Sequence, residues 1–183
     1  MALEHAILVA LAEAPGSGYE LTRRFDRSIG FFWTATHQQI YRVLKRMDER
    51  GWVHGVAVAQ DGRPDKRVYA ISDGGRAELH RWIGAHTNPG PLREDLALKI
   101  RAAAHGDLAA LCAEVARHRD RHAERLDVYR LLEKRDFPAP EQLSGTALHQ
   151  YLVLRGGIRV EEGFTAWCQE VLDALGPHPP EAP

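Results

Sequence analysis

One β-rich stretch interrupts a sequence whose hydrophobic pattern is otherwise helical. Residues 52–59 and 67–71 are rich in residues typical of strands, and the segment 60–64 between them contains the turn-forming pair Asp61-Gly62. Before and after this stretch, apolar residues recur three or four positions apart, as on one face of a helix. The sequence therefore predicts a mainly α fold with one antiparallel β-hairpin.

Apolar spacing over residues 3–11 predicts a first helix, and capping signals predict two more helices before the hairpin and one after it. Ser17 and Glu20 have the spacing of a capping box, in which each side chain bonds a backbone N–H that the helix leaves free. Thr36 and Gln39 repeat this spacing at the start of the third helix, and Ser72 is placed to cap the fourth. Three helices, a hairpin and a fourth helix, in that order, predict a winged helix-turn-helix in residues 1–86.

The predicted third helix has the two faces that a DNA-recognition helix needs. Its apolar stripe is Ile40, Val43, Leu44 and Met47, and its end is marked by Gly51. Between residues 36 and 47 the segment carries three basic side chains, Arg42, Lys45 and Arg46, and none that is acidic. The polar residues of its first turn are those that would meet base edges in the major groove. Solvated charges on an amphipathic helix are the plainer interpretation of this cluster alone.

The near-neutral net charge at first argues against binding to nucleic acid. The chain has 24 Lys and Arg against 25 Asp and Glu, and phosphate neutralisation is the main source of affinity for DNA. The charges are unevenly divided, however, with 12 basic and 10 acidic residues in 1–86 and 12 and 15 in 87–183. Residues 42–67 alone carry seven basic and four acidic side chains. We therefore expect a modestly basic DNA-binding domain joined to a mildly acidic one.

Several segments resemble successive signatures of the PadR family of transcriptional regulators. They are 18–21 (GYEL), 36–51 (THQQIYRVLKRMDERG), 62–69 (GRPDKRVY) and 71–76 (ISDGGR), and 154–158 (LRGGI) is similar to the last helix of the longer subfamily. The resemblance implies that DNA is contacted by Tyr19, Thr36, His37, Gln38, Tyr41 and Lys45, and from the wing by Arg63, Lys66 and Arg67. Arg42 is added to this set as a basic residue of the third helix. For Tyr41, packing of the ring against the base of the wing is an equal alternative. His37 departs from the small residue that many relatives carry there, so the operator sequence is not defined.

The second half of the chain is helical and predicts a dimerisation domain. The segment 88–91 (NPGP) separates it from the first half; helices are expected over 92–104, from a cap at Asp107 to about Arg135, and over 144–175, followed by a disordered tail at 176–183. The resemblance implies a homodimer. Apolar residues at helical spacing predict its contacts, namely Leu108, Leu111, Val115, Leu126, Tyr129, Leu148, Tyr151, Leu152, Trp167 and Leu172.

Other signals do not predict catalysis, a cofactor or a metal. His118 and His122 have a spacing that can hold a metal, but no acidic residue completes a known motif. We therefore interpret them as polar residues on the contact face of a helix rather than as metal ligands. Cys112 and Cys168 lack metal-ligand spacing and are interpreted as buried apolar residues. The apolar run 6–12 is far short of a membrane span, which needs roughly 20 residues. We expect no membrane association, and a cytoplasmic location.

The aromatic residues 31–33 lead to the prediction of a small effector. They are interpreted first as an anchor for the third helix, and alternatively Trp33 lines a pocket for a small aromatic or hydrophobic molecule. The sequence thus predicts a homodimeric PadR-like regulator, a ligand-responsive repressor on a roughly palindromic operator. The alternative is a winged-helix ligand-binding or protein-interaction module that does not bind DNA.

Overall fold

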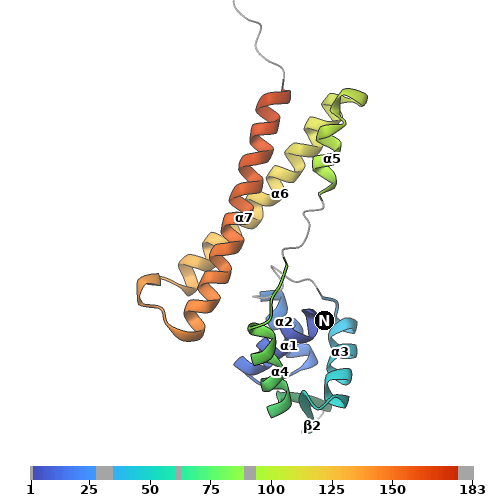
Figure 1. The fold of residues 1–183 in the computed structure, drawn as a ribbon, viewed down its shortest axis with the longest axis vertical. Coiled ribbons are helices and arrows are strands. Elements are labelled where there is room, and N and C mark those ends of the chain that lie inside the picture. Colours follow the sequence, from blue (N-terminus) through green and yellow to red (C-terminus); the bar gives the residue numbers. More distant parts are fainter. Residues whose placement is uncertain (1, 28–34, 61–62, 89–93, 177–183) are drawn as a thin grey trace, which may run out of the picture. The chain divides into compact units, whose positions relative to one another are not determined.

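The computed structural model describes residues 2–27, 35–60, 63–88 and 94–176 (Figure 1). The chain divides into two compact units, Met1–Pro89 and Gly90–Pro183, which are described separately below. Among the described residues, no helix is long and apolar enough to cross a bilayer.

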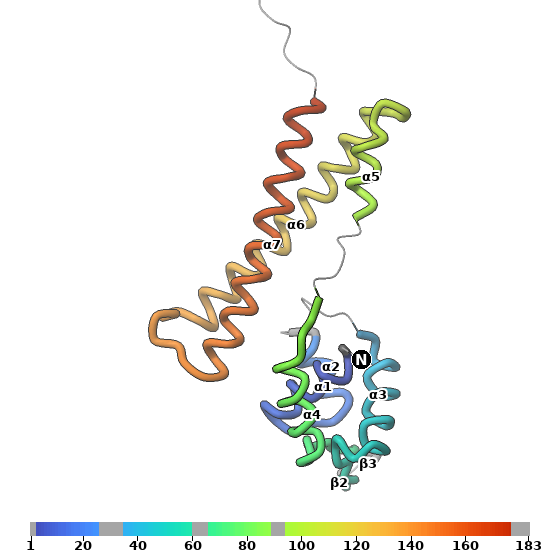
Figure 2. Tube along the Cα trace, in the orientation of Figure 1, coloured from blue at the N-terminus to red at the C-terminus, as the bar shows by residue number. Residues whose placement is uncertain are grey.

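In its described residues, the first unit holds four α-helices and a small antiparallel sheet. The helices are α1 (Ala2–Glu13), α2 (Gly18–Arg27), α3 (His37–Glu49) and α4 (Asp73–Ile83), and the strands are β1 (Gly16–Ser17), β2 (Val53–Gln60) and β3 (Arg63–Ile71). The three strands are ordered β1-β3-β2. The predicted winged-helix architecture and its hairpin are confirmed, and in Figure 2 the hairpin strands lie beside the end of α3.

The third strand, β1, was not predicted. Gly16 and Ser17 pair with Tyr69 and Val68 at the edge of β3. Two residues are too few to show the alternating pattern of a strand, so the sequence contains no signal for β1. The strand is recognised only from its pairing with the edge of β3. It fixes the start of α2 directly on the base of the wing.

The predicted helix starts in the first unit are confirmed by their hydrogen bonds. Thr36 and Gln39 form both halves of a capping box, and Ser17 and Glu20 do the same before α2. The Ser72 hydroxyl accepts the backbone N–H of Gly75 at the start of α4. These local bonds define where each helix begins, and therefore which of its residues point inward.

One apolar core holds the first unit together. It takes in α1, α2, α3 and the inner face of the sheet. Its buried members are Ile7, Leu8, Ala10, Leu11, Leu21, Phe25, Ile40, Val43, Leu44, Met47, Val53, Tyr69 and Ile71. The whole apolar stripe predicted for the third helix is buried here, which leaves the opposite face of α3 turned to solvent.

The second unit is an antiparallel pair of long helices with a short helix packed on one end (Figures 1 and 2). The long helices are α6 (Leu108–Asp136) and α7 (Gly145–Leu175), joined through the 3-10 turn η3 (Pro140–Gln142). The short helix α5 (Asp95–Arg101) buries Leu96 against Val115 and Cys168. Burial of Cys168 agrees with its interpretation as an apolar residue and raises the pKa of its thiol.

The single helix predicted over 92–104 was wrong in extent. Among the described residues of that range, α5 ends at Arg101, and a separate 3-10 turn, η2 (Ala103–His105), follows it. The new helix α6 begins only a few residues later, where the Asp107 carboxylate accepts the N–H groups of Ala109 and Ala110 as predicted. The chain must reverse direction in this short interval, so a continuous helix cannot extend through it.

Candidate nucleic-acid interface

The exposed face of α3 carries the side chains that the sequence predicted for DNA. His37, Gln38, Tyr41, Arg42 and Lys45 are all exposed, opposite the buried stripe. Thr36 is exposed as well, but its hydroxyl already accepts the N–H of the third helical residue in the capping box. The hydroxyl hydrogen of a cap residue can still donate to a phosphate. The face is thus polar and basic along its whole length.

The basic residues of α3 and its C-terminus fall into two classes. Arg46 and Arg50 reach the buried carboxylate of Glu4 on α1, with N···O distances of 2.8 and 3.3 Å. They hold α3 against α1, because a buried carboxylate requires cationic partners. Arg42 and Lys45 make no ion pair with any described residue, and both are exposed to solvent. The sequence does not distinguish these two pairs.

Tyr41 lies beside the start of α2. Its ring is half-exposed and occupies the space that a Cβ would take at Gly18, so glycine is required there. Tyr19, in the first turn of α2, is exposed to a similar degree. The two phenols are therefore available on the surface that adjoins the exposed face of α3, with the ring of Tyr41 held by α2.

The wing cation Arg67 is held by the end of α3. Its guanidinium lies 2.6 Å from a carboxylate oxygen of Asp48, and 5.7 Å from the centre of the Tyr69 ring. The Arg67 side chain crosses the space above Gly55, where a Cβ would collide with it. The other oxygen of Asp48 accepts the backbone N–H of Gly55 at 3.2 Å. One carboxylate thus joins α3 to both strands of the wing.

The neighbouring wing cation Lys66 is held by the start of α2. Its Nζ lies 3.2 Å from Glu20 Oε1. The Glu20 carboxylate accepts the Ser17 N–H at 2.7 Å, and that bond, followed by the one from Lys66, lowers the pKa of Glu20 to about 2. Exposed ion pairs of this kind stabilise a fold by only about 0.2–1 kcal/mol each. Neither acidic partner was anticipated from the sequence, because each lies far along the chain from its cation.

Two predicted site residues cannot be placed. Trp33 lies outside the described residues, and the side chain of Arg63 is likewise not described, although its backbone forms the first residue of β3, opposite Gln60. Lys66 and Arg67 lie opposite Val58 and Ala57, within the ladder rather than at the turn.

The residues predicted for dimerisation divide between the interior and the surface of the helical unit. Val115, Leu126 and Tyr129 are buried within the chain's own helices. Leu111, Leu148, Tyr151, Trp167 and Leu172 are partly buried, while Leu108 and Leu152 are exposed. The apolar residues that the sequence predicted for dimerisation therefore serve in large part to pack the helices of this unit against one another.

A further set of apolar side chains in this unit is exposed and was missed. It consists of Leu98, Val128, Leu131, Val153 and Val160. On α6, Val128 and Leu131 are three positions apart and lie outside the set of buried residues. This second apolar spacing is the pattern that could have revealed them. Together with Leu108 and Leu152, they are exposed apolar side chains of the kind that a second subunit covers.

The two histidines considered for a metal are held by carboxylates. His118 lies 3.4 Å from Glu114. His122 bonds the buried carboxylate of Glu161, which also accepts from Arg125 at 3.1 Å, and its ring stacks on Phe164. Among the described residues, no three His, Cys, Asp or Glu side chains gather in a way that could hold a metal ion.

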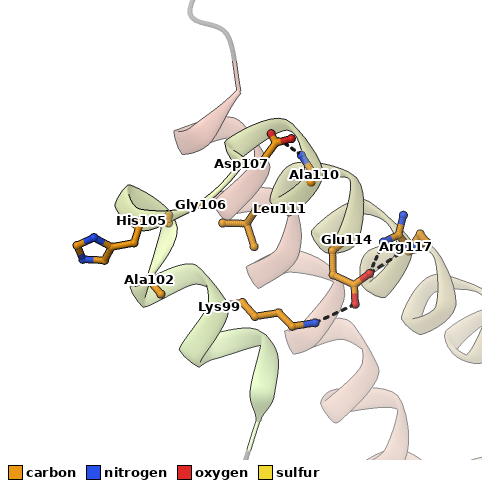
Figure 3. A pocket seen from close by; sticks show the side chains of 10 residues that line it. Lys99, Ala102, His105, Gly106, Asp107, Ala110, Leu111, Glu114 and Arg117 are labelled. Carbon is orange, nitrogen blue, oxygen red and sulfur yellow. Dashed lines mark hydrogen bonds and ion pairs between the residues drawn. The ribbon is translucent and has the colours of Figure 1, made fainter.

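Two hollows lie within the helical unit. One, of about 460 Å³, is formed by α5, η2 and the start of α6 (Figure 3). Glu114 bonds both Lys99 and Arg117 in it, and Asp107 caps α6, so its carboxylates are engaged with groups of the protein itself. The other, of about 330 Å³, lies between α5 and α7 and is mostly apolar. It is lined by Glu94, Ala97, Arg159, Val160, Gly163, Phe164 and Trp167.

Comparison with known families matches both units. The family model described as "Transcriptional regulator PadR-like family" matches residues 7–81. The model described as "Virulence activator alpha C-term" matches residues 92–176.

Individual relatives match over nearly the full length. The probable transcriptional regulator Rv1176c of Mycobacterium tuberculosis is 57% identical, over 96% of this chain and 98% of the relative. The negative transcriptional regulator PadR of Bacillus subtilis is 29% identical, over 93% of this chain and 95% of its own length.

Solved structures extend the likeness to three dimensions. The structure of Bacillus subtilis PadR with operator DNA aligns with a TM-score of 0.85 at 25% identity, over 96% of this chain and 99% of that one. A structure of the same protein with p-coumaric acid aligns with a TM-score of 0.78, at 23% identity over 96% of each chain. The Vibrio cholerae virulence activator AphA aligns with a TM-score of 0.79 at 29% identity, over 94% of this chain and 97% of that one.

Proposed function

The chain belongs to the PadR-like family of transcriptional regulators, and from this premise we propose that it binds operator DNA as a homodimer through α3 and the wing. The observation that carries the proposal is the exposed face of α3, where Arg42 and Lys45 pair with no described carboxylate. A recognition helix needs such cations for phosphates and polar groups for bases. Its relatives are regulators rather than enzymes, in agreement with the interpretation of the sequence.

We assign each predicted side chain a DNA contact according to its position on α3, beside it or on the wing. Gln38 and His37, in the first turn of α3, read base edges. Arg42 and Lys45, further along the helix, neutralise phosphates. The remaining contacts come from the exposed groups beside α3 and from the wing, namely Tyr19, Thr36, Tyr41, Arg63, Lys66 and Arg67.

The homodimer is proposed from the exposed apolar surface of α6 and α7. Leu131 and Leu152 are among the most exposed of its members, and burying them against a second copy removes them from water. A two-fold dimer presents two recognition helices to half-sites one DNA turn apart, which implies a roughly palindromic operator. A protein that binds bacterial chromosomal DNA acts in the cytoplasm.

Repression and response to an effector complete the proposal. The Bacillus subtilis relative is named a negative regulator and was solved with both operator DNA and p-coumaric acid. In this chain, the apolar hollow beside Phe164 and Trp167 has the size and aromatic walls that suit a small aromatic molecule. An effector seated there would change the spacing of the two DNA-binding domains, and with it the affinity for the operator.

The proposal is tested with the DNA upstream of the protein's own gene. Fluorescence anisotropy against this duplex and a scrambled one, at several salt concentrations, should give tighter binding to the first and a steep fall with salt for both. Gln38→Ala should change the sequence preference. Absence of binding to either duplex at low salt would contradict the proposal and favour the alternative, a winged-helix module that does not bind DNA.

A further inference from the structure

Two cations of the wing are neutralised by acidic residues of the same unit. Lys66 pairs with Glu20 at 3.2 Å, and Arg67 pairs with Asp48 at 2.6 Å. We propose that Glu20 and Asp48 are specificity-determining residues: they keep the wing cations occupied against random DNA and release them to phosphates only when the operator is bound. This inference rests on the proposed DNA-binding function.

The two acidic residues are fixed independently of the cations they hold. Glu20 is anchored by the N–H of Ser17, and Asp48 by the N–H of Gly55. Each carboxylate would therefore stay in place if its cation moved away. They also approach the wing from different elements, Glu20 from the start of α2 and Asp48 from the end of α3.

The cations are placed to exchange partners. Lys66 and Arg67 are consecutive residues of β3, so their side chains leave opposite faces of the strand. The side chains are 36% and 56% exposed, which leaves both open to an incoming phosphate. Their ion pairs are weak enough to be replaced, as exposed pairs are.

Exchange affects specific and random complexes differently. Random DNA offers no matched base contacts, so its complex depends on cations that are already available, such as Arg42 and Lys45. The operator also bonds the first turn of α3, which holds the DNA-binding domain close enough for the wing to exchange its pairs. Acidic partners on the wing therefore weaken random binding more than operator binding, and selectivity is a difference of affinities.

Neutral variants that keep the backbone anchors test this inference in the full-length protein. Glu20→Gln and Asp48→Asn retain an oxygen that can accept the anchoring N–H while removing the charge. Each should tighten binding to random-sequence duplex by about three- to tenfold and steepen its salt slope by about 0.9, the amount for one added phosphate contact. The operator slope should stay unchanged, so the ratio of operator to random affinity falls.

Two controls isolate the mechanism. Glu49→Gln removes one negative charge from the same end of α3, at an exposed position without an ion pair to any described residue, and should leave the slope for random DNA as in the wild type. Adding Lys66→Gln to Glu20→Gln should abolish the gain, because the released cation is then absent. Thermal unfolding of each variant checks that the fold is retained.

The outcomes separate this inference from the proposed function. If the wild type binds its operator and the two neutral variants bind random DNA no more tightly than Glu49→Gln does, the acidic residues have only a structural role and the inference is overturned. Weaker binding by the variants overturns it as well. If the wild type binds neither duplex, the proposed function itself fails, and this inference with it.

Discussion

The two units of this chain use their apolar residues in different ways. Among the described residues, the first unit buries 13 apolar side chains and exposes six large ones, whereas the second unit buries seven and exposes seven large ones. The first unit closes its core around the sheet and three helices. The second, mostly two long helices, has too little depth to cover its own apolar side chains. The contrast supports the proposed homodimer, in which a second copy would cover the exposed apolar side chains of the helical unit.

The largest expected effect lies in the core of the first unit. Leu44→Ala removes a fully buried side chain and should lower the free energy of unfolding by about 2–5 kcal/mol, since the cavity cannot fully collapse. Urea denaturation at neutral pH measures this change. Ile83→Ala, at an exposed apolar position of α4, should change stability by less than about 0.5 kcal/mol. Equal effects would mean that the core of this unit does not determine its stability.

A charge on the apolar surface should separate the subunits. Leu131, on α6, is 67% exposed, and Ile83, in the first unit, is 71% exposed. The two positions are therefore similarly exposed but lie in different units. Leu131→Asp should yield monomers in light scattering and reduce operator affinity by about 100-fold, because two linked contacts become one. Ile83→Asp should leave the mass of the wild type unchanged. A dimeric Leu131→Asp variant would place the interface elsewhere.

Two adjacent cations of α3 should behave differently. Lys45→Ala should weaken binding to every DNA sequence about three- to tenfold and reduce the salt slope by about 0.9. Arg46→Ala should leave that slope unchanged and lower stability instead, because Arg46 pairs with the buried carboxylate of Glu4. Salt-dependent anisotropy and urea denaturation on both variants distinguish the roles. A reduced slope for Arg46→Ala would show that its guanidinium leaves Glu4 for the DNA.

The smallest expected effect concerns pH. Bonds from the Ser17 N–H and from Lys66 hold the pKa of Glu20 at about 2, below its ordinary value of 4.5. A carboxylate with a lowered pKa stabilises the fold fully above pH 4.5 and loses that contribution as pH falls toward 2. Because this side chain is partly exposed, we expect less than about 1 kcal/mol. The stability difference between wild type and Glu20→Gln should therefore shrink between pH 5 and pH 2.5, and a constant difference would contradict this account.

Much of the DNA-binding unit could be predicted from the sequence because its signals are local. The capping box of Thr36 and Gln39 spans three residues, and the buried stripe of α3 follows from helical spacing. Gly51, predicted as the end of that helix, has a φ of +70°, a conformation that favours glycine. The interface was predicted less completely. The sequence named Lys66 and Arg67 as wing cations that contact DNA, and the structure pairs both of them with carboxylates.

The sequence by itself determined where α2, α3, α4 and α6 begin, which face of α3 is apolar, and that a hairpin follows it. Hydrogen bonds between residues three or four apart and the period of the helix decide these features, and both are fixed by spacing along the chain. Only the tertiary structure decided that Arg46 serves Glu4 while Lys45 faces solvent, that Gly16 and Ser17 form a strand, and that Asp48 holds the wing. Lys66 and Glu20 are 46 residues apart, and such pairs form only where folding brings two surfaces together. The sequence shows which charged residues are present, and the packing of the fold decides which of them form ion pairs.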